Sequence, residues 1–167
     1  MVPRCWWVAS APSGIPTELL CALLDQGARE LTVVNNNGGN GPIGLSQLFL
    51  AGRVRKLICS FARSANPLQP SAAAFAEVYR AGKIELECVP QGIMVERMRA
   101  AAAGLGPFFS PVSYGSKLAE GKETRVIDGK GMCWSNHCRE TMHSSRHSRP
   151  TAGATSPTVM LDATSAR

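Results

Sequence analysis

Hydrophobic and polar residues along this chain predict short buried strands that alternate with amphipathic helices. Leucines at 19, 20, 23 and 24 form an apolar stripe, Pro16 suits a first helical turn and Gly27 suits a helix end. Short apolar runs bounded by turn residues predict strands at 31–35, 56–61 and 83–89, and helices are predicted at 14–27, 45–51, 72–82 and 95–104. Strands that alternate with helices pair in parallel, so we expect an α/β fold with an open, mostly parallel sheet flanked by helices.

Polar and glycine residues follow two of the predicted strands. Asn35 to Asn37 end the first strand, and Pro90 to Gly92 end the third. Ligands of open α/β sheets bind at the carboxyl ends of the strands. A glycine-rich loop lets backbone N–H groups approach a ligand, and asparagine amides donate and accept hydrogen bonds. Without further evidence, such a loop is more often a turn whose side chains bond its own backbone than a ligand site. Likewise, a residue such as Gln91 more often caps a loop than binds a ligand.

Length, charge and cysteine content narrow the class of protein. The 167 residues, 44% of them hydrophobic, suit one domain. Of the net charge of +6, the first 13 residues contribute +1 and the last 37 contribute +2, so the middle carries only +3. This charge is scattered without interleaved aromatic residues, which argues against nucleic-acid binding. No apolar run reaches the roughly 18 residues of a membrane span, and no secretory signal is evident, so we expect a cytoplasmic protein with reduced cysteines.

The middle of the chain offers no catalytic constellation. No histidine precedes His137, so a Ser-His or Cys-His pair cannot form within residues 14–130. Phe108 and Phe109 are expected to pack in the core rather than against a substrate. We therefore expect the reacting nucleophile to lie outside this chain.

Seven motifs occur in an order typical of one enzyme family: VNNNGGNGPIG, RKLICSF, VYRAGKIELE, VPQG, ERMRAA, FFSP and YGSKLAEGKETRVIDGK. Over residues 14–130 the chain resembles the A (alpha) subunit of the bacterial family I CoA-transferases, most closely the 3-oxoadipate type. The resemblance implies a NagB-RpiA-like α/β domain that forms a heterodimer or heterotetramer with a B subunit. It also implies that a glutamate on the B subunit is the nucleophile, which attacks the acyl-CoA and forms a CoA thioester. CoA would pass from succinyl-CoA to a 3-oxo acid, with no permanently bound cofactor.

The same resemblance implies which residues bind substrate and CoA. Asn36, Asn37 and Gln91 would face the substrate, and the whole expected set is Gly14, Asn36, Asn37, Gly38, Gly39, Gln91, Gly92, Phe109, Tyr114 and Gly115. Ser113 departs from the family pattern, which commonly has glycine there, and the loop at 68–74 is longer than usual. The A subunit of an acetate or acetoacetate CoA-transferase is the alternative within the same enzyme class.

Both ends of the chain depart from the family in a way that indicates a changed reading frame. Codons rebuilt from the last base of one residue and the first two bases of the next turn CWWVASA (5–11) into VLVGGFG, a family motif. The same shift turns MCWSNHC (132–138) into YVLEQPL and TAGATSPTV (151–159) into DRWGNLTYR. We therefore expect residues 1–13 and 131–167 to be out of frame, the fold to be incomplete at both ends, and the tail to be disordered.

The shifted tail contains an arrangement that resembles a zinc site. Cys133, Cys138, His143 and His147 have ligand types that zinc prefers, but their spacing is loose and no apolar framework surrounds them. The frame shift accounts for these residues, so no metal site is expected. A zinc-binding module and an inactive product of a decayed gene are the alternatives outside the enzyme class. Loss of the apolar end strands predicts poor folding and an exposed sheet edge.

Overall fold

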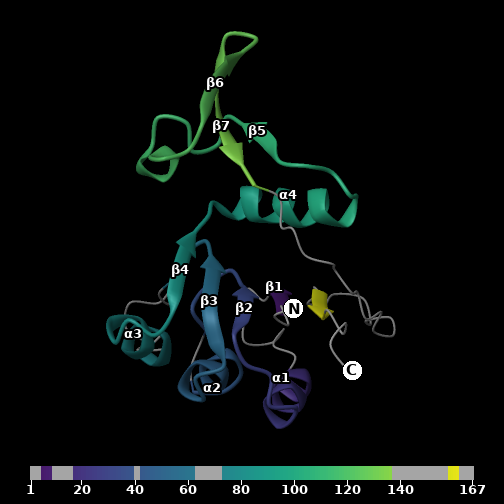
Figure 1. Cartoon of the computed structure of the whole chain (residues 1–167), viewed down its shortest axis with the longest axis vertical. Coiled ribbons are helices and arrows are strands. Elements are labelled where there is room, and N and C mark those ends of the chain that lie inside the picture. The colour runs from purple at the N-terminus through teal and green to yellow at the C-terminus, as the bar shows by residue number, and fades with distance from the viewer. Residues whose placement is uncertain (1–4, 9–16, 40–41, 63–72, 137–157, 162–167) are drawn as a thin grey trace, which may run out of the picture.

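A mostly parallel sheet of five strands forms the centre of the protein (Figure 1). The computed structural model describes residues 5–8, 17–39, 42–62, 73–136 and 158–161. The strands lie in the order β4-β3-β2-β1-β8, and their bounds are β1 Cys5–Val8, β2 Leu31–Val34, β3 Val54–Cys59, β4 Glu85–Cys88 and β8 Thr158–Leu161. Strands β1 to β4 pair in parallel and β8 pairs antiparallel with β1. This arrangement confirms the expected α/β class.

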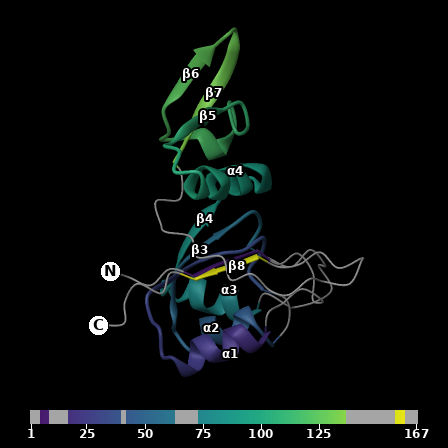
Figure 2. The same ribbon diagram turned by 90° about the vertical axis from the view of Figure 1, so that its right-hand side faces the viewer.

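Helices cover both faces of the sheet (Figure 2). Helices α1 (Thr17–Asp25), α2 (Leu45–Leu50) and α3 (Ala73–Arg80) lie on one face, and α4 (Gln91–Ala102) lies on the other. Because successive strand residues point to opposite faces, Leu57 joins the core with α1 to α3, whereas Ile58 joins the core with α4. Each fully buried side chain of this size stabilises the fold by about 1.5–3 kcal/mol. The predicted apolar runs therefore supply both cores.

A second, antiparallel sheet lies on the far side of α4 (Figure 1). Its strands are β5 (Phe108–Ser110), β6 (Thr124–Ile127) and β7 (Lys130–Ser135), in the order β5-β7-β6, and the short 3-10 helix η2 (Lys117–Ala119) precedes β6. Strands β6 and β7 form a hairpin whose two turn residues, Asp128 and Gly129, have φ of 51° and 72°. Asp-Gly is a favoured pair for such a turn. The pattern of hydrophobic residues did not predict this sheet.

The predicted elements of the middle segment are present, but several boundaries differ. The strand expected at 56–61 is β3 over Val54–Cys59, and the strand expected at 83–89 is β4 over Glu85–Cys88. The helix expected at 95–104 begins at Gln91, directly after Pro90. Proline fixes φ and suits the start of a helix, and here it occupies the N-cap position with φ of −53°. Gln91 and Gly92 therefore belong to the first turn of α4, and the prediction that they lie in a loop after β4 was wrong.

Three described strands lie in or extend into the two segments that were expected to be out of frame. They are β1, β7 and β8. Within the segment that was expected to be a disordered tail, the structure describes strands at Lys130–Ser135 and Thr158–Leu161, and β1 pairs with β2. Tryptophan and valine favour strands, so CWWV suits its place in β1. Apart from Asn136, the rest of both segments lies outside the described residues.

Candidate functional site

Backbone hydrogen bonds bring the loops after β2, β3 and β4 to the same edge of the sheet. The carbonyl oxygen of Asn36 accepts bonds from the N–H groups of Ser60 (3.1 Å) and Phe61 (3.2 Å). The N–H of Val89 donates to the carbonyl oxygen of Cys59 at 2.9 Å. The pairing between strands thus continues past their ends, and the asparagine loop lies directly beside the loop that follows β3.

Asn37 uses its side chain to hold the asparagine loop in shape. Its Oδ1 accepts a bond from the N–H of Gly39 at 2.9 Å, and its carbonyl oxygen accepts one from Nδ2 of Asn35 at 2.9 Å. Gly38 packs so closely on the carbonyl group of Ala62 that a Cβ atom would overlap it. All of these loop residues are buried or half-buried. Asn37 therefore matches the self-bonded turn that the residues alone favoured, and its amide oxygen is already engaged.

Asn36 and Ser60 differ from Asn37 because each has a buried oxygen that is not satisfied. The side chain of Asn36 is buried, at 6% exposure, and within the described structure neither Asn36 Oδ1 nor Ser60 Oγ has a hydrogen-bond partner. A buried polar atom without a partner costs about 1–3 kcal/mol, so such atoms commonly mark the place of a bound group. Ser60 was not among the residues expected from the sequence. Its only signal there is its position near the end of the strand predicted at 56–61.

Gln91 and Gly92 add donors at the same edge. The first intrahelical bond of α4 runs from the N–H of Met94 to the carbonyl oxygen of Pro90, so the N–H groups before Met94 have no intrahelical acceptor. The side chain of Gln91 is exposed, and the space around Gly92 is open. N–H groups at a helix start favour negatively charged ligands. With Ser60 they form a polar edge suited to a carboxylate or a thioester oxygen.

The remaining residues expected at the site lie on the second sheet. Phe109 is half-buried, with its ring 4.9 Å from that of Trp134 at an angle of 68° and 5.0 Å from the guanidinium of Arg125. The ring of Tyr114 packs against Gly131, and Gly115 adopts φ of 70° in the adjoining turn. Strands β5 and β7 lie across α4 from the three loops (Figure 1). The structure thus divides the expected site residues into two groups, and Gly14 lies outside the described residues.

The expectation of a core role holds for Phe108, which packs against the core under α4. Ser113 has φ of 78°, in the left-handed region that favours glycine. Glycine would adopt this geometry without strain.

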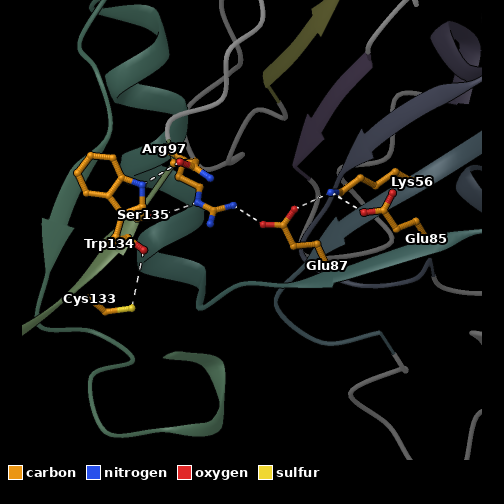
Figure 3. A network of polar contacts seen from close by, with 8 residues as sticks. Lys56, Glu85, Glu87, Arg97, Cys133, Trp134 and Ser135 are labelled. Atoms are coloured by element: carbon orange, nitrogen blue, oxygen red, sulfur yellow. Dashed lines mark hydrogen bonds and ion pairs between the residues drawn. The ribbon is translucent and has the colours of Figure 1, made fainter. Parts of the chain in front are cut away.

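A chain of ion pairs and hydrogen bonds links the two sheets through α4 (Figure 3). Lys56 Nζ lies 2.8 Å from Glu85 and 2.9 Å from Glu87, Glu87 lies 2.6 Å from Arg97, and Nε of Arg97 donates to Oγ of Ser135 at 2.9 Å. Burial alone would raise the pKa of Glu87, but bonds from Arg97 and Lys56 outweigh it and hold that pKa below its usual value. Burial would lower the pKa of Lys56, but bonds to Glu85 and Glu87 raise it. The network fixes α4, and with it Gln91, against β4.

The described residues include no group of three or more side chains that could hold a metal ion. Cys133 is buried in β7, whereas Cys138, His143 and His147 of the zinc-like arrangement lie outside the described residues. Among the helices that the structure describes, none is long and apolar enough to cross a membrane.

Residues 10–149 match the family described as "Coenzyme A transferase". The chain is 57% identical over 118 residues to the A subunit of 3-oxoadipate CoA-transferase from Pseudomonas putida, covering 71% of this chain and 49% of that protein. It is 38% identical over 120 residues to the alpha subunit of acetate CoA-transferase from Escherichia coli K12, covering 70% of this chain and 50% of that protein. The chain spans about half the length of these curated relatives.

Two solved structures share the fold. An acyl-CoA transferase of E. coli O157:H7, in a thioester complex with CoA, has a TM-score of 0.62 at 21% identity, covering 82% of this chain and 30% of that one. A variant of the decarboxylase AibA/AibB has a TM-score of 0.63 at 22% identity, covering 81% of this chain and 53% of that one. One fold thus carries two different reactions, so the fold alone does not identify the reaction.

Proposed function

Because the chain belongs to the coenzyme A transferase family, we propose that it is the A subunit of an enzyme that moves CoA from succinyl-CoA to 3-oxoadipate. The main support for this proposal is that sequence identity is higher to a 3-oxoadipate enzyme than to relatives that are named for other acids. Identity is 57% to the A subunit of a 3-oxoadipate CoA-transferase, 42% to that of a succinyl-CoA:3-ketoacid coenzyme A transferase and 38% to the alpha subunit of an acetate CoA-transferase. Transfer to acetate or acetoacetate is the second candidate.

In the proposed reaction this chain binds and orients the substrates, and a glutamate of a B subunit reacts. The glutamate attacks the acyl-CoA, an enzyme-bound CoA thioester forms, and the acceptor acid then takes the CoA, in ping-pong order. CoA thioester is thus a substrate, and no permanent cofactor is required. Ser60 Oγ and the N–H groups at the start of α4 would donate hydrogen bonds to substrate oxygens, whereas Asn36 Oδ1 would accept a bond from an N–H or O–H group of a bound substrate. We place the assembly, a heterodimer or heterotetramer, in the cytoplasm.

The test is a reconstituted transfer assay. The full chain is co-expressed with the B subunit of the Pseudomonas putida enzyme, and formation of the acceptor's CoA thioester from succinyl-CoA is measured with 3-oxoadipate, acetoacetate and acetate. We expect the highest kcat/KM with 3-oxoadipate and no transfer by either protein alone. A preference for acetate or acetoacetate would support the second candidate. A purified complex without any transfer would indicate that this chain is inactive.

We also propose that the in-frame CoA-transferase domain comprises residues 14–130 and that residues 1–13 and 131–167 are out of frame. Two of the curated relatives align over 118 and 117 residues, close to the length of that segment, although the family match runs from residue 10 to 149. Resequencing the coding DNA tests the proposal directly. A second chain with VLVGGFG, YVLEQPL and DRWGNLTYR restored is then compared in the same assay. We expect the restored chain to unfold at a higher temperature and to be more active, and equal behaviour would contradict the proposal.

A further inference from the structure

Two cysteines face each other at the carboxyl ends of β3 and β4. Cys59 and Cys88 are direct partners in the parallel pairing of these strands. Paired strands lie about 4.8 Å apart, and a disulfide joins Cα atoms that are about 4.4–6.8 Å apart. Directly paired residues also project from the same face of the sheet. The backbone therefore already holds the two residues within the span of a disulfide bond.

The two thiols differ in their surroundings. Cys59 is fully buried in the core, whereas Cys88 is exposed on the edge strand. Burial raises the pKa of the Cys59 thiol to about 12, and the neighbouring Cys88 thiol, which forms a hydrogen bond with Cys59, adds to this increase. The buried thiol thus stays protonated, and an oxidant in solution reaches Cys88 first.

From this geometry we propose that Cys88 and Cys59 form a peroxide-sensitive dithiol, in which Cys88 is oxidised first and Cys59 resolves it to a disulfide. The Cys88 thiolate attacks a peroxide oxygen, an S–O bond forms, the O–O bond breaks, and the released hydroxide takes a proton to become water. The Cys59 sulfur then attacks the Cys88 sulfur, the S–O bond breaks, and the leaving hydroxide takes the Cys59 proton. Two thiols lose two electrons, and hydrogen peroxide is reduced to two waters.

The bond would fix the strand ends that carry the polar edge. Cys59 directly precedes Ser60, and Cys88 directly precedes Val89 and Pro90 at the start of α4. The disulfide would therefore join two of the three loops covalently, whichever acid the enzyme accepts.

The experiment treats the reduced full chain with hydrogen peroxide, blocks the remaining thiols in denaturant, and maps the peptides by mass spectrometry. We expect two of the six thiols to be lost, with one linked peptide pair that contains Cys59 and Cys88 and that dithiothreitol separates. Cys59→Ser should stop at a sulfenic acid on Cys88 that dimedone traps. Cys88→Ser should leave Cys59 reduced. Cys21→Ser, which changes an exposed cysteine of α1, should leave the linked pair unchanged.

A control in urea separates a folded pair from random oxidation. The proposal is wrong if the Cys59–Cys88 peptide is absent, or if pairs that contain Cys21 form as readily. It is equally wrong if the linked peptide forms in the same yield from the unfolded chain, because the strand pairing would then play no part. The Cys88→Ser variant keeps the test usable if Cys59→Ser fails to fold, since Cys88 is exposed.

Discussion

Replacing Glu87 with glutamine should destabilise the protein, because this carboxylate is the only described acidic side chain that contacts Arg97. Arg97 is 7% exposed at its side chain, and Glu87 lies 2.6 Å from it and 2.9 Å from Lys56. Glutamine keeps an oxygen acceptor of similar shape but removes the charge that faces two cations. The variant therefore isolates the electrostatic part of the network.

The magnitude follows from the two bonds. A hydrogen bond to a charged group contributes about 1.5–3 kcal/mol, against about 0.5–1.5 kcal/mol for a neutral one, so two bonds could lose about 2–3 kcal/mol. Glu87 is 31% exposed, and solvent reduces this difference, which leaves about 2 kcal/mol. For a chain of this size the melting temperature should fall by about 4–8 °C.

The effect should depend on pH in a defined direction. The folded-state pKa of Glu87 lies below its ordinary value of 4.5, so its contribution is complete above that value. The contribution is lost as pH falls through the folded-state pKa, when the unfolded chain binds the proton more readily. Glutamine does not titrate. The difference in stability between the native chain and the variant should therefore be full at about pH 7 and smaller at about pH 3.

Urea unfolding, followed by circular dichroism and tryptophan fluorescence, measures both quantities. Glu96→Gln in helix α4 is the control, because Glu96 pairs with Arg99, which is 74% exposed, and should change stability by less than about 0.5 kcal/mol. The reasoning fails if Glu87→Gln costs no more than this control at about pH 7, or if its cost is the same at both pH values.

Two further predictions concern backbone geometry. Gly38→Ala should destabilise the chain by about 1–3 kcal/mol and raise KM in the reconstituted enzyme, because the new methyl group would overlap the carbonyl oxygen of Ala62. The methyl group of Gly92→Ala would enter open space, so this variant should have unchanged or slightly higher stability. Denaturation midpoints and transfer kinetics check this pair, and equal effects would contradict it. Ser113→Gly should raise the melting temperature, since it relieves about 1 kcal/mol of left-handed strain at φ of 78°, and an unchanged or lower melting temperature in a thermal scan would count against it.

Strand β2 of the main sheet could be predicted from the sequence because it is buried on both faces. Leu31 to Val34 are all buried, and such a strand appears as a continuous apolar run. The second sheet lacks this signal, since Thr124 to Ile127 are all exposed. The Asp-Gly pair at 128–129 was the available sign of its hairpin.

The polar network could not be predicted for a different reason. Arg97 lies in the segment VERMRA, which is typical of a solvated helix face. Its burial depends on Glu87 and on Ser135, which is 38 positions away in the sequence. Ser60 is similar, because its significance comes from an oxygen left without a partner beside Asn36. Contacts of this kind become visible only when distant segments are placed together.

The place of β1 between β2 and β8 bears on how genes of this kind change. Every residue other than proline provides one backbone N–H and one backbone C=O for hydrogen bonds between strands, whatever its side chain. A shift of reading frame replaces all side chains of a segment at once yet leaves the number of these groups nearly constant. A central strand can therefore survive such an event whenever the new codons encode β-favouring residues, and under the proposed change of frame Cys-Trp-Trp-Val would be such a segment. A glycine loop such as that at Gly38 cannot accept such a replacement of side chains, because a single added methyl group would overlap the carbonyl group of Ala62.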